Sequence, residues 1–121
     1  MRVVVVGAGV SGLLAARSLS QAGHAVVVFD KGRSSGGRCA TRRIGNAVFD
    51  HGAQFFTVRS DDFARLVHEW SASGVAREWC RGFGAGDGHP RYCGVGGMTT
   101  ITKHLAAPLD VRYSKLVFSL D

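Results

Sequence analysis

The sequence lacks paired cysteines. It contains three, Cys39, Cys80 and Cys93, and no C-x-x-C pair. An odd number without close spacing argues against a disulfide framework and against a four-cysteine metal site. The histidines at 24, 68, 89 and 104 show no metal-ligand spacing either, so no metal site is predicted. A reducing compartment is the simpler setting for such thiols, and we expect a cytoplasmic protein.

Long apolar runs are also missing. The apolar stretch at the N-terminus breaks at Gly7, which is too early for a signal peptide or a membrane span. The net charge is +6, which suits anionic partners. However, the densest basic group, formed by arginines 33, 38, 42 and 43, makes no continuous run, and the chain has no zinc-finger spacing or aromatic RNA-binding signature. We therefore expect a small-molecule ligand rather than nucleic acid or a membrane.

The first thirty residues are typical of a strand–helix–strand unit. Residues 2–6 (RVVVV) form a β-branched run, and residues 25–30 (AVVVFD) form a second one that ends in an acid. Between them, residues 10–22 place Val10, Leu13, Leu14 and Leu19 at helical spacing. Such a unit has a right-handed crossover and a parallel sheet. The predicted fold class is therefore α/β, with a Rossmann-like nucleotide-binding core.

The remainder predicts a partial, β-rich insertion and a final strand. Gly45-Asn46 separates two short strands, and Ser60-Asp61 is a candidate N-cap for a helix rich in apolar residues at helical spacing. The expected strands are 39–43, 47–50, 75–80, 91–95 and 111–120, the expected helices are 61–73 and 99–106, and 81–90 is expected to be a mobile, turn-rich loop. With 121 residues, we expect one domain, 1–121. Because the last strand has no return path, we expect the domain to be incomplete.

The segment GAGVSG, residues 7–12, fits the G-x-G-x-x-G pattern directly after a strand and at a helix start. In this pattern, Gly7 permits the tight turn, Gly9 lets the backbone approach a pyrophosphate, and Gly12 allows close packing of helix on strand. The phosphates would lie at the positive end of the helix, where Ser11 adds a backbone N–H group. These features predict a dinucleotide site.

Asp30 lies eighteen residues beyond Gly12, at the end of the second strand. A carboxylate at this place accepts hydrogen bonds from the adenosine ribose hydroxyls and repels a ribose 2′-phosphate. This disfavours NADP, although Lys31 and Arg33 are both close enough in sequence to reach such a phosphate.

The segment Gly36-Gly37-Arg38 follows Asp30 within eight positions. Its glycines let the chain pass close to a ligand, and its arginine can pair with phosphates. With this segment, the pattern "VVVGAGVSGLLAARSL…VVVFDKGRSSGGRCATRR…FDHGAQFFTVR" resembles the N-terminal part of renalase-like flavoproteins. These belong to the wider group of amine oxidases and NAD(P)/FAD-dependent oxidoreductases. The likeness is strong to about residue 70 and looser through "GVGGMTTITKHLA".

The resemblance implies FAD as the cofactor and assigns roles to matching residues. Gly7, Gly9, Ser11 and Gly12 would hold the pyrophosphate, Asp30 and Lys31 the adenosine ribose, and Gly37 and Arg38 the phosphate and ribityl region. Gly52, Ala53, Gln54 and Phe55 would approach the isoalloxazine ring, and Lys115 and Leu116 the adenine. The implied reaction is oxidation of a reduced small molecule, in the renalase case a dihydronicotinamide dinucleotide, with NAD(P) as possible substrate or product and oxygen as the final acceptor.

This sequence departs from the family in length and carries Cys39 where the family often has Met. No catalytic residue is assigned, because hydride transfer to flavin needs no general base. His51 is a candidate flavin tether or acid–base group, and Cys39 a candidate reactive thiol, but a polar histidine and a small buried thiol are the favoured interpretations. Two other functions stay open: a catalytically silent nucleotide-binding module, and an NAD-binding dehydrogenase or regulatory domain without flavin. An open sheet edge also allows a homo-oligomer.

Overall fold

The fold has two parts, and the first part is built on a three-stranded parallel sheet. A computed structural model describes residues 1–84, 86 and 88–119. Strand β1 (Arg2–Val6) pairs with β2 (Ala25–Phe29), and β2 pairs with β7 (Asp110–Arg112). The order β7-β2-β1 corresponds to the first three strands of a doubly wound nucleotide-binding sheet, read as 3-2-1. The β-branched runs therefore form the central strands, as the sequence predicts.

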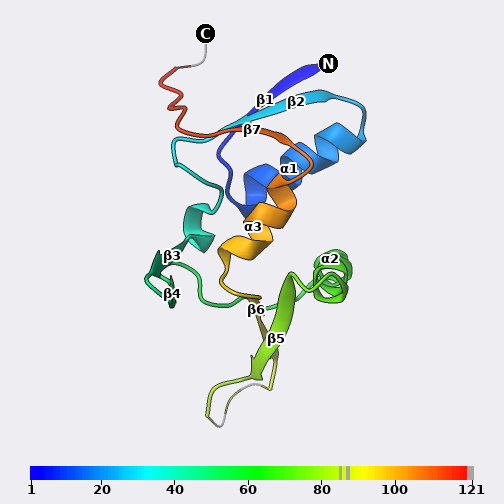
Figure 1. The fold of residues 1–121 in the computed structure, drawn as a ribbon. Coiled ribbons are helices and arrows are strands. Elements are labelled where there is room, and N and C mark those ends of the chain that lie inside the picture. The colour runs from blue at the N-terminus through cyan, green and yellow to red at the C-terminus, as the bar shows by residue number, and fades with distance from the viewer. Residues whose placement is uncertain (85, 87, 120–121) are drawn as a thin grey trace.

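Helices α1 (Val10–Gln21) and α3 (Thr99–Ala106) lie together beside this sheet (Figure 1). Helix α1 packs against β2 and against α3. The buried side chains at this junction include Leu13, Val28, Ile101 and Leu105, each at most 2% exposed. Because the apolar stripe of each helix faces the same core, α1 and α3 hold the β1–α1 turn against the carboxyl end of the sheet.

Two hairpins and one helix form the second half of the fold, away from the sheet (Figure 1). Strands β3 (Thr41–Ile44) and β4 (Ala47–Asp50) make one hairpin. Strands β5 (Ala76–Arg81) and β6 (Pro90–Gly94) make the other, and α2 (Asp61–Ala72) packs against β5. Phe56 stacks on Tyr92 with ring centroids 5.7 Å apart and meets Trp70 edge-on. These rings join the hairpin, the helix and the connecting chain.

Most predicted elements are confirmed to within one or two residues. The hydroxyl of Ser60 accepts a hydrogen bond from the Phe63 amide and so caps α2, as expected. The predicted strand 39–43 is wrong at its start, because Gly37–Cys39 forms a short 3₁₀ turn, η1. The predicted strand 111–120 is wrong beyond Arg112, after which the described chain is irregular. Residues 85 and 87 of the predicted 81–90 loop, and residue 120 of that strand, lie outside the described residues.

Over the described ranges, no helix has both the length and the apolar character needed to cross a membrane.

Candidate nucleotide-binding site

A cavity lies at the start of α1, where the sequence predicts the pyrophosphate. Its volume is about 550 Å³, and two segments of the chain line it. The lining residues are Val6, Gly7, Gly9, Val10, Ser11 and Gly12 from the first segment and Gly36, Gly37, Arg38 and Cys39 from the second. Six of the predicted site residues therefore share one cavity.

The N-terminus of α1 presents backbone donors to this cavity. Gly9 is the N-cap, no side chain caps the helix, and its first turn contains no acidic residue. The first N–H groups of a helix have no acceptor within it. Gly7 and Ala8 direct their own N–H groups elsewhere, to the Phe29 carbonyl at 2.8 Å and to Asp30 at 2.6 Å. The amides of the first helical turn are thus the donors for an anion, favoured by the helix dipole.

Gly12 is required by packing, and it also lines the cavity. A Cβ atom at this position would lie 2.0 Å from the Gly7 carbonyl oxygen and 3.1 Å from its carbonyl carbon. The backbone of α1 therefore passes directly over the preceding turn, which no larger residue allows. This is the role that the G-x-G-x-x-G pattern predicts for its third glycine.

Asp30 is fixed against the glycine turn in this structure. Its Oδ2 accepts the Ala8 N–H at 2.6 Å, and its Oδ1 accepts the Gly32 N–H at 2.7 Å. A carboxylate has about four acceptor positions, so capacity for ribose hydroxyls is left on both oxygens. The sequence predicts the ribose contact but not this link to Ala8, which braces the turn from the neighbouring strand.

The second segment is bonded directly onto the first. The Gly36 N–H donates to the Ala8 carbonyl at 3.0 Å, and a Cβ on Gly37 would meet the Gly9 Cα at 3.3 Å. Arg38 follows on the exposed rim of the cavity. Gly36 lines the cavity as well, as expected for a glycine pair that lets the chain pass close to a ligand, although the resemblance assigned a role only to Gly37 and Arg38. The arginine is thereby brought beside the glycine turn.

The segment 52–55 reaches the same region through the backbone of Arg38. The Ala53 N–H donates to the Arg38 carbonyl at 2.7 Å. Gln54 is exposed, as are Lys31 and Ser11, so each can contact a ligand without displacing core residues. Near the predicted adenine contacts, the Lys115 N–H donates to the Asp30 carbonyl at 2.9 Å. Asp30, Ala53 and Lys115 are thus connected to the cavity-lining segments by hydrogen bonds but do not line the cavity themselves.

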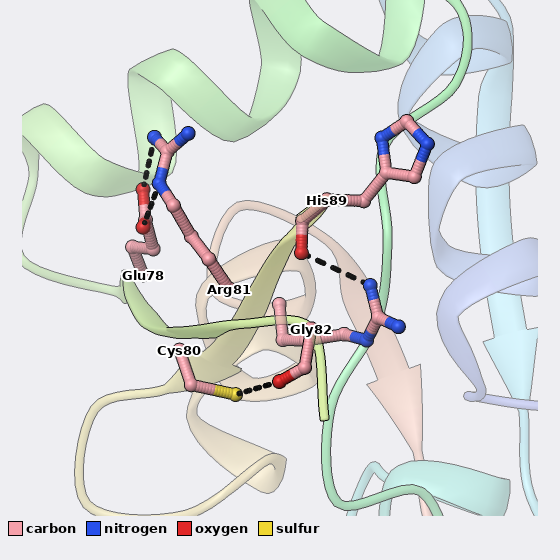
Figure 2. Close-up of polar contacts among 6 residues, drawn as sticks. Glu78, Cys80, Arg81, Gly82 and His89 are labelled. Carbon is pink, nitrogen blue, oxygen red and sulfur yellow. Dashed lines mark hydrogen bonds and ion pairs between the residues drawn. The ribbon is translucent and has the colours of Figure 1, made fainter. Parts of the chain in front are cut away.

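Phe55 lies among aromatic and cationic side chains at the end of the β5–β6 hairpin. Its ring lies 6.1 Å from Trp79 and 5.5 Å from Phe83, and the Arg91 guanidinium lies 5.7 Å from its centre. Figure 2 shows the polar contacts around this end, where Arg81 pairs with Glu78 and the Cys80 thiol donates to the Gly82 carbonyl. Phe55 therefore anchors the 52–55 segment to the hairpin, a role that the sequence analysis did not predict.

Cys39 lines the cavity as a half-buried thiol. Burial raises its pKa above the ordinary value, the Asp50 carboxylate raises the pKa further, and Arg38 lowers it by a smaller effect. Since the thiolate is the reactive form, a raised pKa means less thiolate at neutral pH. The favoured interpretation was a small buried thiol; Cys39 is half-buried instead, and the direction of its pKa favours the unreactive thiol form.

We accordingly expect iodoacetamide to alkylate Cys39 at pH 7 more slowly than it alkylates glutathione, because little thiolate is present. Asp50→Asn removes the nearby negative charge, which lowers the pKa of Cys39, and it should therefore speed the reaction. Peptide mass spectrometry resolves Cys39 from Cys80 and Cys93. The control is Asp62→Asn, which changes an exposed carboxylate on α2. Alkylation of wild-type Cys39 as fast as glutathione would contradict the raised pKa.

Comparison with known proteins gives a consistent assignment. The profile of the NAD(P)-binding Rossmann-like domain matches residues 5–70. A Mycobacterium tuberculosis protein named as a flavin-containing monoamine oxidase is 43% identical over 67 residues, which are 55% of this chain and 15% of that protein. Putrescine oxidase of Kocuria rosea is 39% identical over 67 residues, covering 55% of this chain and 14% of the relative. The chain thus spans about 15% of the length of these curated relatives.

The fold agrees with the sequence comparison. A solved structure of a putrescine oxidase variant superposes with a TM-score of 0.51 and 32% identity, over 78% of this chain and 22% of that one. The relatives are named as amine oxidases, which supports the wider group predicted from the sequence but not its renalase-like branch. The flavin in one relative's name agrees with FAD as the predicted cofactor. This chain therefore belongs to the NAD(P)-binding Rossmann-like domain family, in the form found in the flavin-dependent amine oxidase superfamily.

Proposed function

We propose that this chain binds FAD and forms the cofactor-binding part of an oxidoreductase. The observation that carries this proposal is the single cavity in which the glycine turn, the first turn of α1 and the Gly36–Arg38 segment meet. It offers free backbone donors, a guanidinium and glycine surfaces without side chains, which together suit a pyrophosphate and the chain beyond it. Gly9 in particular faces open space, because a Cβ atom added there would have no neighbour within 4 Å. A ligand can therefore approach its backbone.

The chain's own residues bind and orient the cofactor. The amides of the first turn of α1 hold the pyrophosphate, and Arg38 neutralises its charge. Asp30 accepts hydrogen bonds from the ribose hydroxyls. Ala53 and Gln54 flank the ring end of the site, since Ala53 is bonded to Arg38. When bound, FAD supplies hydride acceptance from a reduced small molecule and reoxidation by oxygen. The protein contributes position and electrostatics.

Two substrate classes are consistent with such a site. The motif DHGAQFFTVR, residues 50–59, supports a renalase-like chain and a dihydronicotinamide substrate. The relatives named as monoamine and putrescine oxidases favour an amine instead. We propose the cofactor and the oxidation of a small molecule as the function, with the amine as the second candidate substrate. We also propose that residues 1–121 act as one nucleotide-binding domain and that the three free thiols reflect a cytoplasmic setting.

The test is the visible absorption spectrum of the purified chain, with and without added FAD. We expect a flavin spectrum whose pigment is released on heating, because no tether is needed to hold it. Arg38→Ala should weaken FAD binding by about tenfold or more, since it removes a charge-assisted hydrogen bond to phosphate. Arg42→Ala, a neighbouring exposed arginine that does not line the cavity, is the matched control.

Four outcomes would contradict different parts of this proposal. Unchanged FAD affinity in Arg38→Ala would remove the assigned role of Arg38. Pigment that stays with heated protein would instead point to His51 or Cys39 as a covalent tether. Binding of NAD but not FAD would favour the NAD-binding domain without flavin. FAD binding without turnover of an amine or a dihydronicotinamide would favour the catalytically silent module.

A further inference from the structure

Asp50 lies at the end of β4 and joins three distant parts of the chain. Its Oδ1 accepts a hydrogen bond from the Thr41 hydroxyl at 2.6 Å and another from the Met98 N–H at 2.9 Å. Thr41 begins β3, and Met98 immediately precedes α3. The sequence separation between Asp50 and Met98 is 48 residues. One half-buried carboxylate oxygen therefore ties the β3–β4 hairpin to the start of α3.

Two threonines complete this link. The Thr41 N–H donates to the Thr99 hydroxyl at 2.6 Å, and the Thr99 N–H donates to the Thr41 hydroxyl at 2.9 Å. The Thr99 hydroxyl in turn donates to the Cys39 carbonyl at 3.2 Å. Each hydroxyl thus donates once and accepts at least once, with no donor left over. We call Asp50, Thr41 and Thr99 the hairpin clamp.

The clamp supplies acceptors for two N–H groups at the start of α3, those of Met98 and Thr99. The N-cap residue of α3, Met98, makes no side-chain capping bond, and the first turn of the helix contains no acidic residue. A carboxylate near a helix N-terminus satisfies an unpaired N–H and is favoured by the helix dipole. Asp50 supplies that carboxylate from another element. The contact is therefore both a cap for α3 and an anchor for the hairpin.

The clamp holds the two segments expected at the flavin end of the site. On one side, Thr99 binds the Cys39 carbonyl, one residue after Arg38. On the other side, Asp50 is two residues before Gly52, where a Cβ would lie only 2.2 Å from the Arg38 carbonyl oxygen. The Ala53–Arg38 hydrogen bond closes the arrangement. By contrast, the turn at Gly7 is fixed by the separate bonds from Gly7 and Ala8 to β2 and Asp30.

We propose that Asp50 is a positioning residue for the flavin-side half of the cofactor site. The proposal rests on FAD binding as set out above. Asp50 does not line the cavity; it acts through Thr41 and Met98 by fixing where Arg38 and the 52–55 segment lie. Loss of its carboxylate therefore affects mainly the part of the ligand beyond the adenosine diphosphate, and it affects the diphosphate only through Arg38.

The test compares FAD with ADP as ligands of the same variants. We expect Asp50→Ala to weaken FAD binding by about tenfold or more and ADP binding by clearly less, because ADP shares the α1 turn, Asp30 and Arg38 with FAD but lacks the part that the 52–55 segment would contact. Asp50→Asn keeps one oxygen that accepts both hydrogen bonds, and it should restore FAD affinity to within about threefold of wild type. Thr99→Val should show the Asp50→Ala pattern. Asp62→Ala, an exposed carboxylate on α2, is the matched control.

The ratio of the two affinities separates positioning from general destabilisation. Equal losses of ADP and FAD binding in both Asp50→Ala and Thr99→Val would overturn the proposal, because they would show a purely structural role. Unchanged FAD binding in these variants would overturn it as well, while leaving FAD binding by the wild type intact. A wild-type chain that binds ADP but not FAD would instead overturn the proposed cofactor, and the role of Asp50 with it.

Discussion

Replacing Gly9 with valine is expected to abolish FAD binding while the chain stays folded. In this structure Gly9 has an ordinary extended backbone, with φ −82° and ψ 176°, which a valine can adopt. A Cβ at Gly9 would have no atom within 4 Å, so the added side chain meets open cavity rather than protein. That cavity is where the pyrophosphate would lie. We expect affinity to fall by about 100-fold or more, equivalent to about 3 kcal/mol.

The measurement is FAD affinity by flavin fluorescence, together with thermal unfolding of the same sample. Valine is a poorer N-cap than glycine, so a stability loss of about 1 kcal/mol is expected. Ala15→Val is the control, because it adds a β-branched side chain on the exposed face of the same helix, away from the cavity. Wild-type FAD loading in Gly9→Val would show that the pyrophosphate lies elsewhere.

Replacing Gly12 with alanine is expected to destabilise the fold itself. The added methyl group would lie 2.0 Å from the Gly7 carbonyl oxygen, and both groups belong to the backbone or are fixed to it. Relief requires α1 to move away from β1, against core contacts made by the fully buried Leu13 and Ala16. Overpacking of this kind costs about 1–3 kcal/mol and sometimes more. At the upper end of that range, we expect a loss of about 3 kcal/mol in the free energy of unfolding.

Urea unfolding followed by circular dichroism measures this loss. Gly9→Ala is the matched control, because it makes the same chemical change three residues earlier without a close contact. Its expected cost is about 1 kcal/mol or less, the usual penalty for alanine at an N-cap. Equal stability of the two alanine variants would contradict the close approach of α1 to the Gly7 carbonyl.

Helices and strands are predicted most accurately from the sequence where the residues that determine them lie close together in the chain. The strand–helix–strand unit was predictable because its β-branched runs, helical apolar spacing and glycine turn all act within about thirty residues. The end of the strand predicted for 111–120 was not predictable in this way. Its residue pattern suits a strand, but the strand with which it pairs is short. Strand β2 offers β7 only the register positions Val27, Val28 and Phe29. Beyond them, the Ser114 and Lys115 amides donate to the Gly32 and Asp30 carbonyls, so the chain leaves the sheet.

The cavity likewise combines residues that a local motif predicts with residues that only tertiary contacts bring to it. That Gly7, Gly9 and Gly12 line the cavity was predictable because all three belong to one local motif. That the Gly36–Arg38 segment closes the cavity depends on the Gly36–Ala8 hydrogen bond, which joins two turns from different strands. The turn η1 replaces the expected strand start at Cys39, since the Cys39 and Ala40 amides donate back to Gly36 and Gly37. Local pattern alone did not distinguish that turn from an extended chain.

The sequence by itself determined the βαβ core, the glycine turn and the acid at the end of β2, because short-range backbone preferences and apolar periodicity are sufficient for them. Only the tertiary structure decided how the later segments meet that core. Helix α3 lacks a cap of its own and receives one from Asp50. Phe55 finds its ring partners on a hairpin that lies well beyond it in the sequence. Such contacts arise when separate elements pack, and no local pattern encodes them.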